Sequence, residues 1–244
     1  PAGPGGQWMQ DVPLVRTQVQ PGAMQASLNG KVIPLAQGKE VFVSTVRPVD
    51  RVTIDNAPMV FMGYGVTAPE QGWDDFKGVD LKGKIAVFLV NDPDFEATEA
   101  DDAAGKFGNR RMTYYGRWTY KFEEAARRGA IGALIVHDTP GAGYDWKTVI
   151  APGGENYDLA DVPADQRILL QGWLEGAAAA RLFANAGEDL AALRVKARQK
   201  DFHPVPLKGA TFSADIPVQH TRVMSRNVLA KIPGKSRPDE EILY

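Results

Sequence analysis

The alternation of apolar and polar positions predicts a first quarter built from short strands. Runs compatible with strands lie at 11–19, 26–28, 41–45 and 59–62. Asn29-Gly30 follows the second run, and this dipeptide between alternating residues is typical of a tight β-hairpin. We therefore expect antiparallel strands joined by turns between residues 7 and 67.

The middle of the chain predicts a strand, helix, strand unit. Residues 84–90 hold a continuous apolar core, which indicates a strand buried on both faces. Residues 117–128 have a helical period, with an apolar stripe that we expect to pack on the sheet and two outward acid–base pairs at i,i+4 spacing. The stripe comprises Trp118, Phe122, Ala125 and Ala126, and the pairs are Glu123/Arg127 and Glu124/Arg128. Gly129 ends this helix, and a second strand at 131–137 then favours parallel pairing.

The last third predicts a strand at 167–171, an alanine-rich helix at 175–186 that ends at Gly187, and a short helix at 189–197. Residues 138–165 form a loop in this interpretation. A further strand is expected at 221–232, then a turn at 233–238 and the start of another strand at 241–244. Because the sequence stops within that last apolar run, we interpret its end as a cut.

Composition and charge narrow the classes of partner. Apolar residues make up 44% and charged residues 24% of the 244 positions, as in globular domains. The net charge is −2, with both signs mixed along the chain, which argues against nucleic acid as a partner. The longest apolar runs, 85–90 and 133–136, are too short for a membrane span. The chain has no cysteine, so thiol chemistry and cysteine-bound zinc are excluded.

Motifs with possible chemistry are weak. Gly63-Tyr64-Gly65 matches the start of a dinucleotide fingerprint, but Pro69 and Gly72 follow where a helix is needed, so we predict a tight turn. Gly234-Lys235-Ser236 lacks the first glycine of a phosphate-binding loop. The acidic segment 91–102 lacks the spacing of a calcium loop and is interpreted as a solvated loop without chemistry.

The three histidines give no metal-binding or catalytic pattern. His137, His203 and His220 are scattered, and none lies in a spacing that puts two ligands on one metal. His137 follows a buried strand next to Asp138, where we expect a local hydrogen bond. No G-x-S-x-G elbow is present. We therefore predict no catalytic residue, no metal ligand and no cofactor site in these residues.

Several longer motifs point to a family. They are Val-Phe-Met-Gly-Tyr-Gly-Val-Thr-Ala-Pro-Glu at 60–70, Trp-Asp-Asp-Phe at 73–76, Asp-Leu-Lys-Gly-Lys-Ile at 80–85, Ala-Ala-Arg-Arg-Gly-Ala-Ile-Gly-Ala-Leu-Ile-Val at 125–136, Gly-Trp-Leu at 172–174, and 202–207. Together they resemble the protease-associated domain of bacterial co-catalytic di-zinc aminopeptidases, in the glutamate carboxypeptidase and transferrin-receptor group. The resemblance implies a mixed α/β fold: a β-sandwich or open barrel with a βαβ unit and flanking helices, plus edge strands of the peptidase α/β domain.

The two ends resemble peptidase strands that bracket the inserted domain. They are residues 8–15 and 227–234, and we expect 10–15 and 226–232 to be neighbours in one sheet. The resemblance implies an N-terminal peptidase strand at 1–19, a protease-associated domain at 20–212, and return strands at 213–244, truncated before the metal site. In the family, the segment that follows leads into a histidine and an aspartate that bind metal.

The resemblance implies a non-catalytic lid or substrate-access domain of an enzyme that removes N-terminal residues from peptides. We expect no catalytic activity from these residues alone. The implied partners are peptide substrates and the catalytic domain of the same chain, which would hold two zinc ions, and the implied location is periplasmic or extracellular. Tyr115, Arg117 and Trp118 match a segment that faces the cleft, where an arginine can meet a substrate carboxylate. The residues themselves favour the plainer alternative, in which Arg117 is an ordinary surface residue at a helix start.

Two other functions stay open. One is a free-standing binding module of the same type, which captures peptides or proteins without a hydrolase. The other is a nucleotide-dependent enzyme, which rests only on the glycines around Tyr64. The strand pair at 227–244 argues against the free module, because such a module has no need for strands with exposed edges.

Overall fold

The computed structural model describes residues 1–163, 166–237 and 240. The strands are β1 (Met9–Val19), β2 (Ala23–Leu28), β3 (Lys31–Pro34), β4 (Val41–Ser44), β5 (Arg51–Phe61), β6 (Thr67–Ala68), β7 (Trp73–Asp74), β8 (Ile85–Leu89), β9 (Gly132–Val136), β10 (Glu155–Leu159), β11 (Leu170–Leu174) and β12 (Val205–Val228). The helices are α1 (Trp118–Arg127), α2 (Thr139–Ala142), α3 (Trp146–Ile150), α4 (Gly176–Asn185) and α5 (Leu190–Lys196), with short 3-10 turns η1 (Pro4–Gly6) and η2 (Pro69–Gln71).

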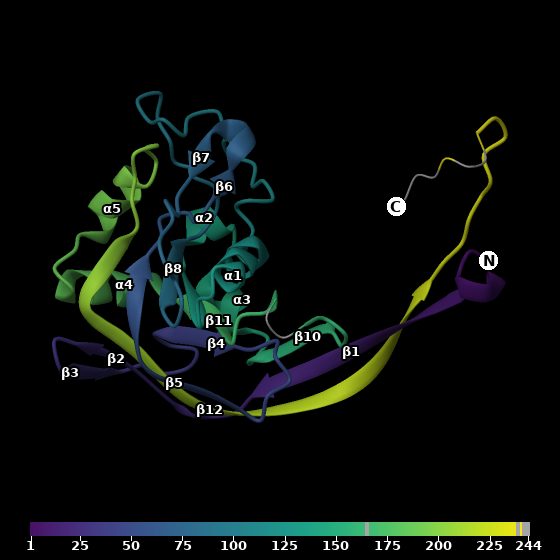
Figure 1. The fold of residues 1–244 in the computed structure, drawn as a ribbon, viewed down its shortest axis with the longest axis horizontal. Coiled ribbons are helices and arrows are strands. Elements are labelled where there is room, and N and C mark those ends of the chain that lie inside the picture. Colours follow the sequence, from purple (N-terminus) through teal and green to yellow (C-terminus); the bar gives the residue numbers. More distant parts are fainter. Residues whose placement is uncertain (164–165, 238–239, 241–244) are drawn as a thin grey trace.

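One curved, mixed sheet organises the body, and helices cover both of its faces (Figure 1). Its order is β10-β1-β12-β5-β8-β9-β11-β4, and the β2–β3 hairpin is attached beside β12. The hairpin turns at Asn29 and Gly30, whose φ angles of 51° and 83° are those of a tight turn of this kind. The mixed α/β class and the hairpin are confirmed, while a protease-associated domain stays a prediction.

The central strands are parallel and buried on both faces, as their sequences predict. β8 pairs in parallel with β5 and β9, and β9 with β11. Every residue of β8 and β9 is buried. Ile85, Val87 and Leu89 join the core beneath α4 and α5, whereas Ala86 and Phe88 join the core beneath α1. A strand with solvent on neither side must be apolar at every position.

The turn after β5 confirms the interpretation of its glycines. Gly65 has φ of +65°, and a Cβ there would lie 2.3 Å from the Phe88 ring. The Gly63 carbonyl accepts a hydrogen bond of 2.7 Å from the Leu89 amide. Glycine is needed here because only it combines this backbone conformation with such a close approach.

Helix α1 also follows the prediction. Arg127 lies 3.8 Å from Glu123, and Arg128 lies 3.3 Å from Glu124. Gly129 follows the helix with φ of +78°. This residue ends the helix because the left-handed conformation is available to glycine without strain.

Four strand predictions are wrong in their bounds, including that of β2, which begins at Ala23. β5 begins at Arg51, β11 spans 170–174, and β12 begins at Val205. Pro206, Gly209 and Pro217 in β12 resemble strand breakers, but the register against β5 shifts between Pro206 and Thr211. Irregular pairing of this kind accommodates residues that a regular ladder excludes.

β10 lies in a segment interpreted as a loop. It pairs antiparallel with β1, with Thr17 opposite Asn156 and Leu14 opposite Leu159. The sequence of β10 has little alternation, so its pairing depends on the neighbouring strand. The predicted loop at 138–165 also contains the short helices α2 and α3.

The outer ends of β1 and β12, residues 9–13 and 224–228, form a two-stranded arm that projects from the body (Figure 1), whereas the inner half of β1 also pairs with β10. The register runs from Met9 opposite Val228 to Val19 opposite Val218. The predicted pairing of the two chain ends in one sheet is confirmed, but the partner of 10–15 is 222–227 and not 226–232, and the strand ends at Val228. β12 runs without interruption through residues 212 and 213, and the division into three segments stays a prediction. The strand predicted at 241–244 lies outside the described residues.

Candidate functional site

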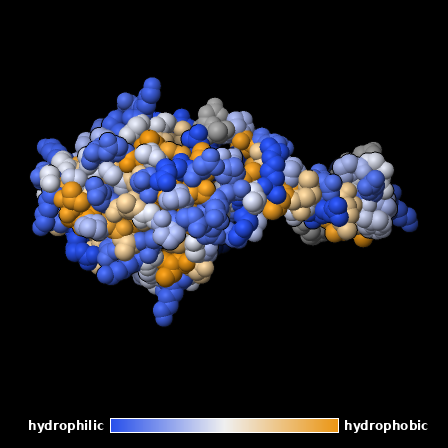
Figure 2. Space-filling view, turned by 90° about the horizontal axis from the view of Figure 1, so that it is seen from below, coloured by the Kyte–Doolittle hydropathy of each residue, from blue (hydrophilic) through white to orange (hydrophobic). Residues whose placement is uncertain are grey.

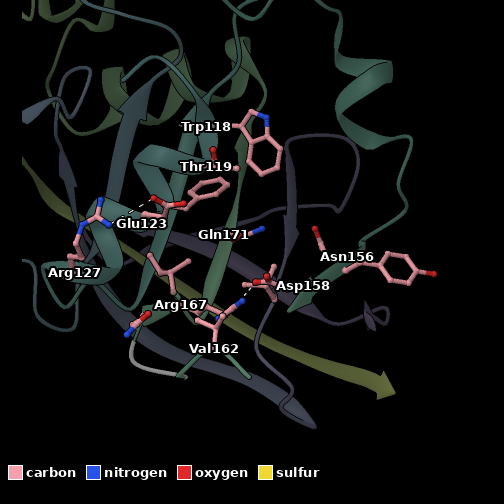
Figure 3. A pocket seen from close by; sticks show the side chains of 14 residues that line it. Trp118, Thr119, Glu123, Arg127, Asn156, Asp158, Val162, Arg167 and Gln171 are labelled. Atoms are coloured by element: carbon pink, nitrogen blue, oxygen red, sulfur yellow. Dashed lines mark hydrogen bonds and ion pairs between the residues drawn. The ribbon is translucent and has the colours of Figure 1, made fainter. Parts of the chain in front are cut away.

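A cavity of about 750 Å³ lies between α1 and β10 (Figure 3). α1 contributes Trp118, Phe122 and Arg127 to its wall. Asn156 comes from β10 and Gln171 from β11. The cavity therefore combines aromatic surface with amide groups that can donate and accept hydrogen bonds.

Trp118 joins this cavity to two smaller hollows. One of about 270 Å³ is also lined by Phe42, Tyr144 and Trp173, and the other, of about 350 Å³, by Arg117 and Tyr144. Because Trp118 lines all three, we treat them as one groove, called the Trp118 groove below. Six aromatic residues contribute to its walls, among polar and charged ones, and they offer surface to apolar side chains: Phe42, Trp118, Phe122, Tyr144, Tyr157 and Trp173.

The expected packing of Trp118 on the sheet is wrong. Its side chain is 43% exposed, whereas Phe122 is 6% exposed. The Trp118 ring meets the edge of the Phe122 ring at 5.9 Å between centroids. Trp118 is the first residue of α1, and its side chain borders the groove, whereas Phe122 and Ala125 farther along the helix pack in the core.

Arg117 lies at the rim of the groove as the N-cap residue of α1. In the part of the chain that the structure describes, its exposed side chain makes no hydrogen bond or ion pair. Arg127 binds Glu124 at 2.6 Å, and Arg167 pairs with Asp158. Arg117 therefore keeps all of its donors free for a ligand carboxylate or carbonyl, and Arg167 keeps one, because its buried Nη1 has no hydrogen-bond partner among the described residues.

Tyr115 lies behind the groove and lines none of its three parts as described. Its hydroxyl donates to Glu70 at 2.7 Å, and this bond raises the pKa of the phenol. Its ring packs edge-on against Tyr120 and Phe107 at 5.2 and 6.0 Å. The structure therefore brings Arg117 and Trp118 together, and gives Tyr115 a supporting position.

Two buried carboxylates fix the long segment that leads to Arg117. Asp92 accepts hydrogen bonds from the Thr113 amide at 2.6 Å and its hydroxyl at 2.8 Å. Asp94 accepts from the amides of Phe107 and Asn109 at 2.8 and 2.9 Å. The interpretation of 91–102 as a solvated loop is wrong at its start, because Asp92 and Asp94 are buried. Their carboxylates accept hydrogen bonds from backbone amides that have no partner in a strand or helix.

The burial of Asp92 changes its pKa and limits which residue fits at position 116. Desolvation raises the pKa of Asp92, although the bonds from Thr113 oppose this effect. A Cβ on Gly116 would lie 2.9 Å from the Asp92 carboxylate. A glycine at this position lets the backbone pass the buried carboxylate and places Arg117 at the groove.

Lys121 is fully buried beneath the groove. Its Nζ donates to the carbonyls of Tyr64, Asn91 and Tyr115 at 2.6, 3.0 and 3.3 Å. These three bonds use all the donors of the ammonium group. Burial lowers the pKa of Lys121 to about 8. The side chain thus ties α1 to the glycine turn and to the segment that carries Arg117.

Asp75 is a further buried acidic residue of this interior, in addition to Asp92 and Asp94. Its carboxylate accepts from the Val66 amide at 2.9 Å and from Trp73 Nε1 at 2.8 Å. Burial raises its pKa to about 7.

Sequence reasoning missed both Lys121 and Asp75. The signal for Lys121 was its place on the apolar stripe, three residues after Trp118 and four before Ala125.

The histidines lie apart from one another. His137 Nε2 lies 3.0 Å from the Tyr144 carbonyl, so its local partner is not Asp138, which instead accepts from Gly141 and Arg194. His220 contacts Asp50 at the protein surface. Across residues 1–163, 166–237 and 240, no group of three or more His, Cys, Asp or Glu could hold a metal ion. None of the helices described is long and apolar enough to cross a bilayer.

The chain is similar in structure to bacterial peptidases. An aminopeptidase from Aneurinibacillus sp. is 18% identical, with a TM-score of 0.42, over 94% of this chain and 39% of that one. A peptidase M28 precursor from Shewanella amazonensis is 13% identical, with a TM-score of 0.38, over 94% and 42%. A zinc aminopeptidase from Bacillus subtilis is 13% identical, with a TM-score of 0.31, over 88% and 35%.

The chain thus spans about two fifths of the length of these structures. No protein-family profile and no curated protein sequence matches it.

Proposed function

We propose that this chain is a non-catalytic accessory domain of a zinc-dependent aminopeptidase, and that its arm joins it to the catalytic domain of the same polypeptide. The motifs within residues 60–85 and 125–136, which resemble those of a protease-associated domain, support the proposal. In it, the catalytic domain would hold two zinc ions. The described residues offer no group of ligands for them, so no step of the hydrolysis is assigned to this chain.

The arm is the observation that carries the proposal. Its strands expose Met9 at 46%, Met224 at 60% and Val228 at 67%. Figure 2 shows the arm as a narrow projection with hydrophobic side chains on its surface. Apolar side chains and unpaired strand edges in such a projection favour contact with a further protein surface. A catalytic domain in the same polypeptide would supply that surface.

The Trp118 groove supports a role in substrate access. It offers aromatic surface to apolar side chains, and Arg117 offers a free guanidinium to a carboxylate or carbonyl.

Secretion to the periplasm or cell exterior is part of the same proposal. Fractionation of the native host with an antibody against this chain tests it, and recovery in the cytoplasm would contradict it.

The first experiment concerns the chain itself. Elemental analysis of the purified chain is expected to find no stoichiometric zinc, and leucine and alanine anilides are expected to stay intact. About one or two zinc ions per chain would overturn the non-catalytic assignment. The reading frame beyond Tyr244 is expected to continue into Ala-His-x-Asp.

The second experiment tests the arm in the complete polypeptide. Val228→Asp is expected to lower the melting temperature of the complete polypeptide and leave that of this chain unchanged. Val195→Asp is the matched control, because Val195 is 51% exposed on α5, away from the arm. Equal effects of the two substitutions in the complete polypeptide would remove the arm from the proposal.

The groove alone also suits a free-standing peptide-binding module. The two functions differ in the reading frame: a stop codon directly after Tyr244, together with a monomer that binds peptides, would favour the module. The arm would then need a different partner.

A further inference from the structure

A second hollow, of about 360 Å³, lies between the β2–β3 hairpin and α4. The hairpin lies below α4 in Figure 1. Leu174, Leu182 and Phe212, which line this hollow, belong to the core on the α4 side of the sheet, whereas Phe122 and Trp173 of the Trp118 groove belong to the other core. The two sites therefore lie on opposite faces of the sheet.

The interior of this hairpin hollow is apolar. Its wall includes Ile33 and Leu35 from the hairpin side, Met59 from β5 and Leu182 from α4. The volume falls within the range of pockets that bind small molecules, roughly 300 to 1,000 Å³. Such a space suits an unbranched or branched hydrocarbon chain.

The rim of the hollow is positively charged. Lys31 and Arg181 line it with exposed side chains, and within the described part of the chain neither makes a hydrogen bond or an ion pair. Glu40 is the acidic group of the rim. Its carboxylate accepts from the Ala36 amide at 3.0 Å and lies 3.5 Å from Lys39, and the Ala36 bond lowers its pKa. The charge of Glu40 is thus offset within its own turn.

We propose that the hairpin hollow binds an apolar chain that ends in a carboxylate, with the chain between the hairpin and α4 and the carboxylate near Lys31 and Arg181. An apolar lining with two unpaired cations in it is complementary to this chemistry. A fatty acid and the C-terminus of an apolar peptide both present it. The inference does not depend on the peptidase assignment.

Calorimetric titration of the purified chain tests the proposal with decanoate, below its micelle concentration, and with the neutral alcohol decanol. Decanoate is expected to bind more tightly than decanol and to raise the melting temperature. Arg181→Gln and Lys31→Gln are each expected to weaken decanoate about two- to fivefold, as for other exposed ion pairs. Lys208→Gln, at an exposed lysine outside the hollow, is the control and is expected to change nothing.

Ala178→Leu tests the location. Ala178 is a buried residue of the hollow, so the larger side chain fills the space and is expected to abolish binding. Ala177→Leu, at the exposed neighbouring position, is expected to bind normally. If Ala178→Leu does not fold, acetylation of the native chain gives the same information: decanoate is expected to protect Lys31 and not Lys208.

Decanol that binds as tightly as decanoate, or decanoate binding that survives Ala178→Leu, would overturn the proposal. So would equal acetylation of Lys31 with and without decanoate. Acetyl-Leu-Leu distinguishes a peptide C-terminus from a fatty acid as the ligand, and its C-terminal amide is the control without a carboxylate. Tighter binding of acetyl-Leu-Leu than of decanoate assigns the site to peptide C-termini. The reverse order assigns it to fatty acids.

Discussion

The central strands and the arm use the same backbone pairing but differ in what covers it. β8 and β9 have a strand on each side, and all of their side chains are buried. At the outer end of the arm, Met9 pairs only with Val228, and both side chains are exposed. Backbone hydrogen bonds contribute little net stability, whereas apolar burial contributes most of it. The body can therefore hold itself together, while the arm gains from a further surface.

The largest difference is expected between Phe61→Ala and Val228→Ala. Phe61 is fully buried, with its ring edge-on to Phe183 at 5.3 Å and to Phe202 at 5.9 Å. Its truncation is expected to lower the free energy of unfolding by about 3 to 5 kcal/mol. Val228→Ala is expected to stay within about 0.5 kcal/mol, because the side chain is already in water. Urea denaturation of both variants measures this, and similar losses would contradict the division into body and arm.

Lys121→Met tests whether the polar interior of the body stabilises it as its apolar core does. The substitution keeps a chain of similar length but leaves the carbonyls of Tyr64, Asn91 and Tyr115 without their donor. A buried group left unpaired costs about 1 to 3 kcal/mol, and we expect a loss of at least this size in urea denaturation. Lys208→Met, at an exposed lysine, is the control. A Lys121→Met variant as stable as its parent would show that the ammonium is dispensable.

The pH dependence of stability is expected to report Asp75. Its pKa of about 7 in the folded chain lies above the value of 3.8 for a free carboxyl, so the folded state binds more protons between these values. Its contribution is complete below about pH 4 and is lost as pH rises through 7. The pKa of Lys121 is lowered to about 8 in the folded chain, so the unfolded state binds more protons above this pH. Its titration is therefore expected to make stability rise from pH 8 upward.

The measurement is the difference in melting temperature between the native chain and Asp75→Asn. Asparagine does not titrate here, so the advantage of the native chain is expected to shrink as pH rises from 5 to 7.5. Glu155→Gln is the control, because this half-buried carboxylate pairs with Arg16, which lowers its pKa. A constant difference across the range would contradict a raised pKa at Asp75.

The sequence predicted those parts whose pattern is set by local burial. The runs at 84–90 and 131–137 are apolar at nearly every position because helices cover both faces of their strands, and this pattern needs no knowledge of the partners. β12 and β10 were not predictable in this way. Their pairing is set by strands far away in the sequence, which tolerate Pro217 in β12 and the polar residues of β10.

The candidate site was predictable only in part, for a related reason. Arg117 and Trp118 were found through a motif, and the structure places them together at the groove. The interior beneath them depends on carbonyls and amides from separate turns, as for Lys121 and Asp92. A lysine or an aspartate in a sequence is usually solvated, so these contacts cannot be inferred before the chain is folded.

The smallest effect on stability is expected at Arg117, and it sharpens the contrast within α1 itself. Phe122→Ala removes a buried ring and is expected to cost about 3 to 5 kcal/mol. Arg117→Ala removes an exposed side chain that has no partner in the described chain, so its cost is expected to stay within about 0.5 kcal/mol. In the complete polypeptide the order is expected to reverse, with Arg117→Ala lowering kcat/KM for peptides more than Phe122→Ala at temperatures where both are folded. Melting curves and peptide kinetics measure the two halves. An unstable Arg117→Ala chain would give Arg117 a structural role, and full activity of that variant in the complete polypeptide would make it an ordinary surface residue at a helix start.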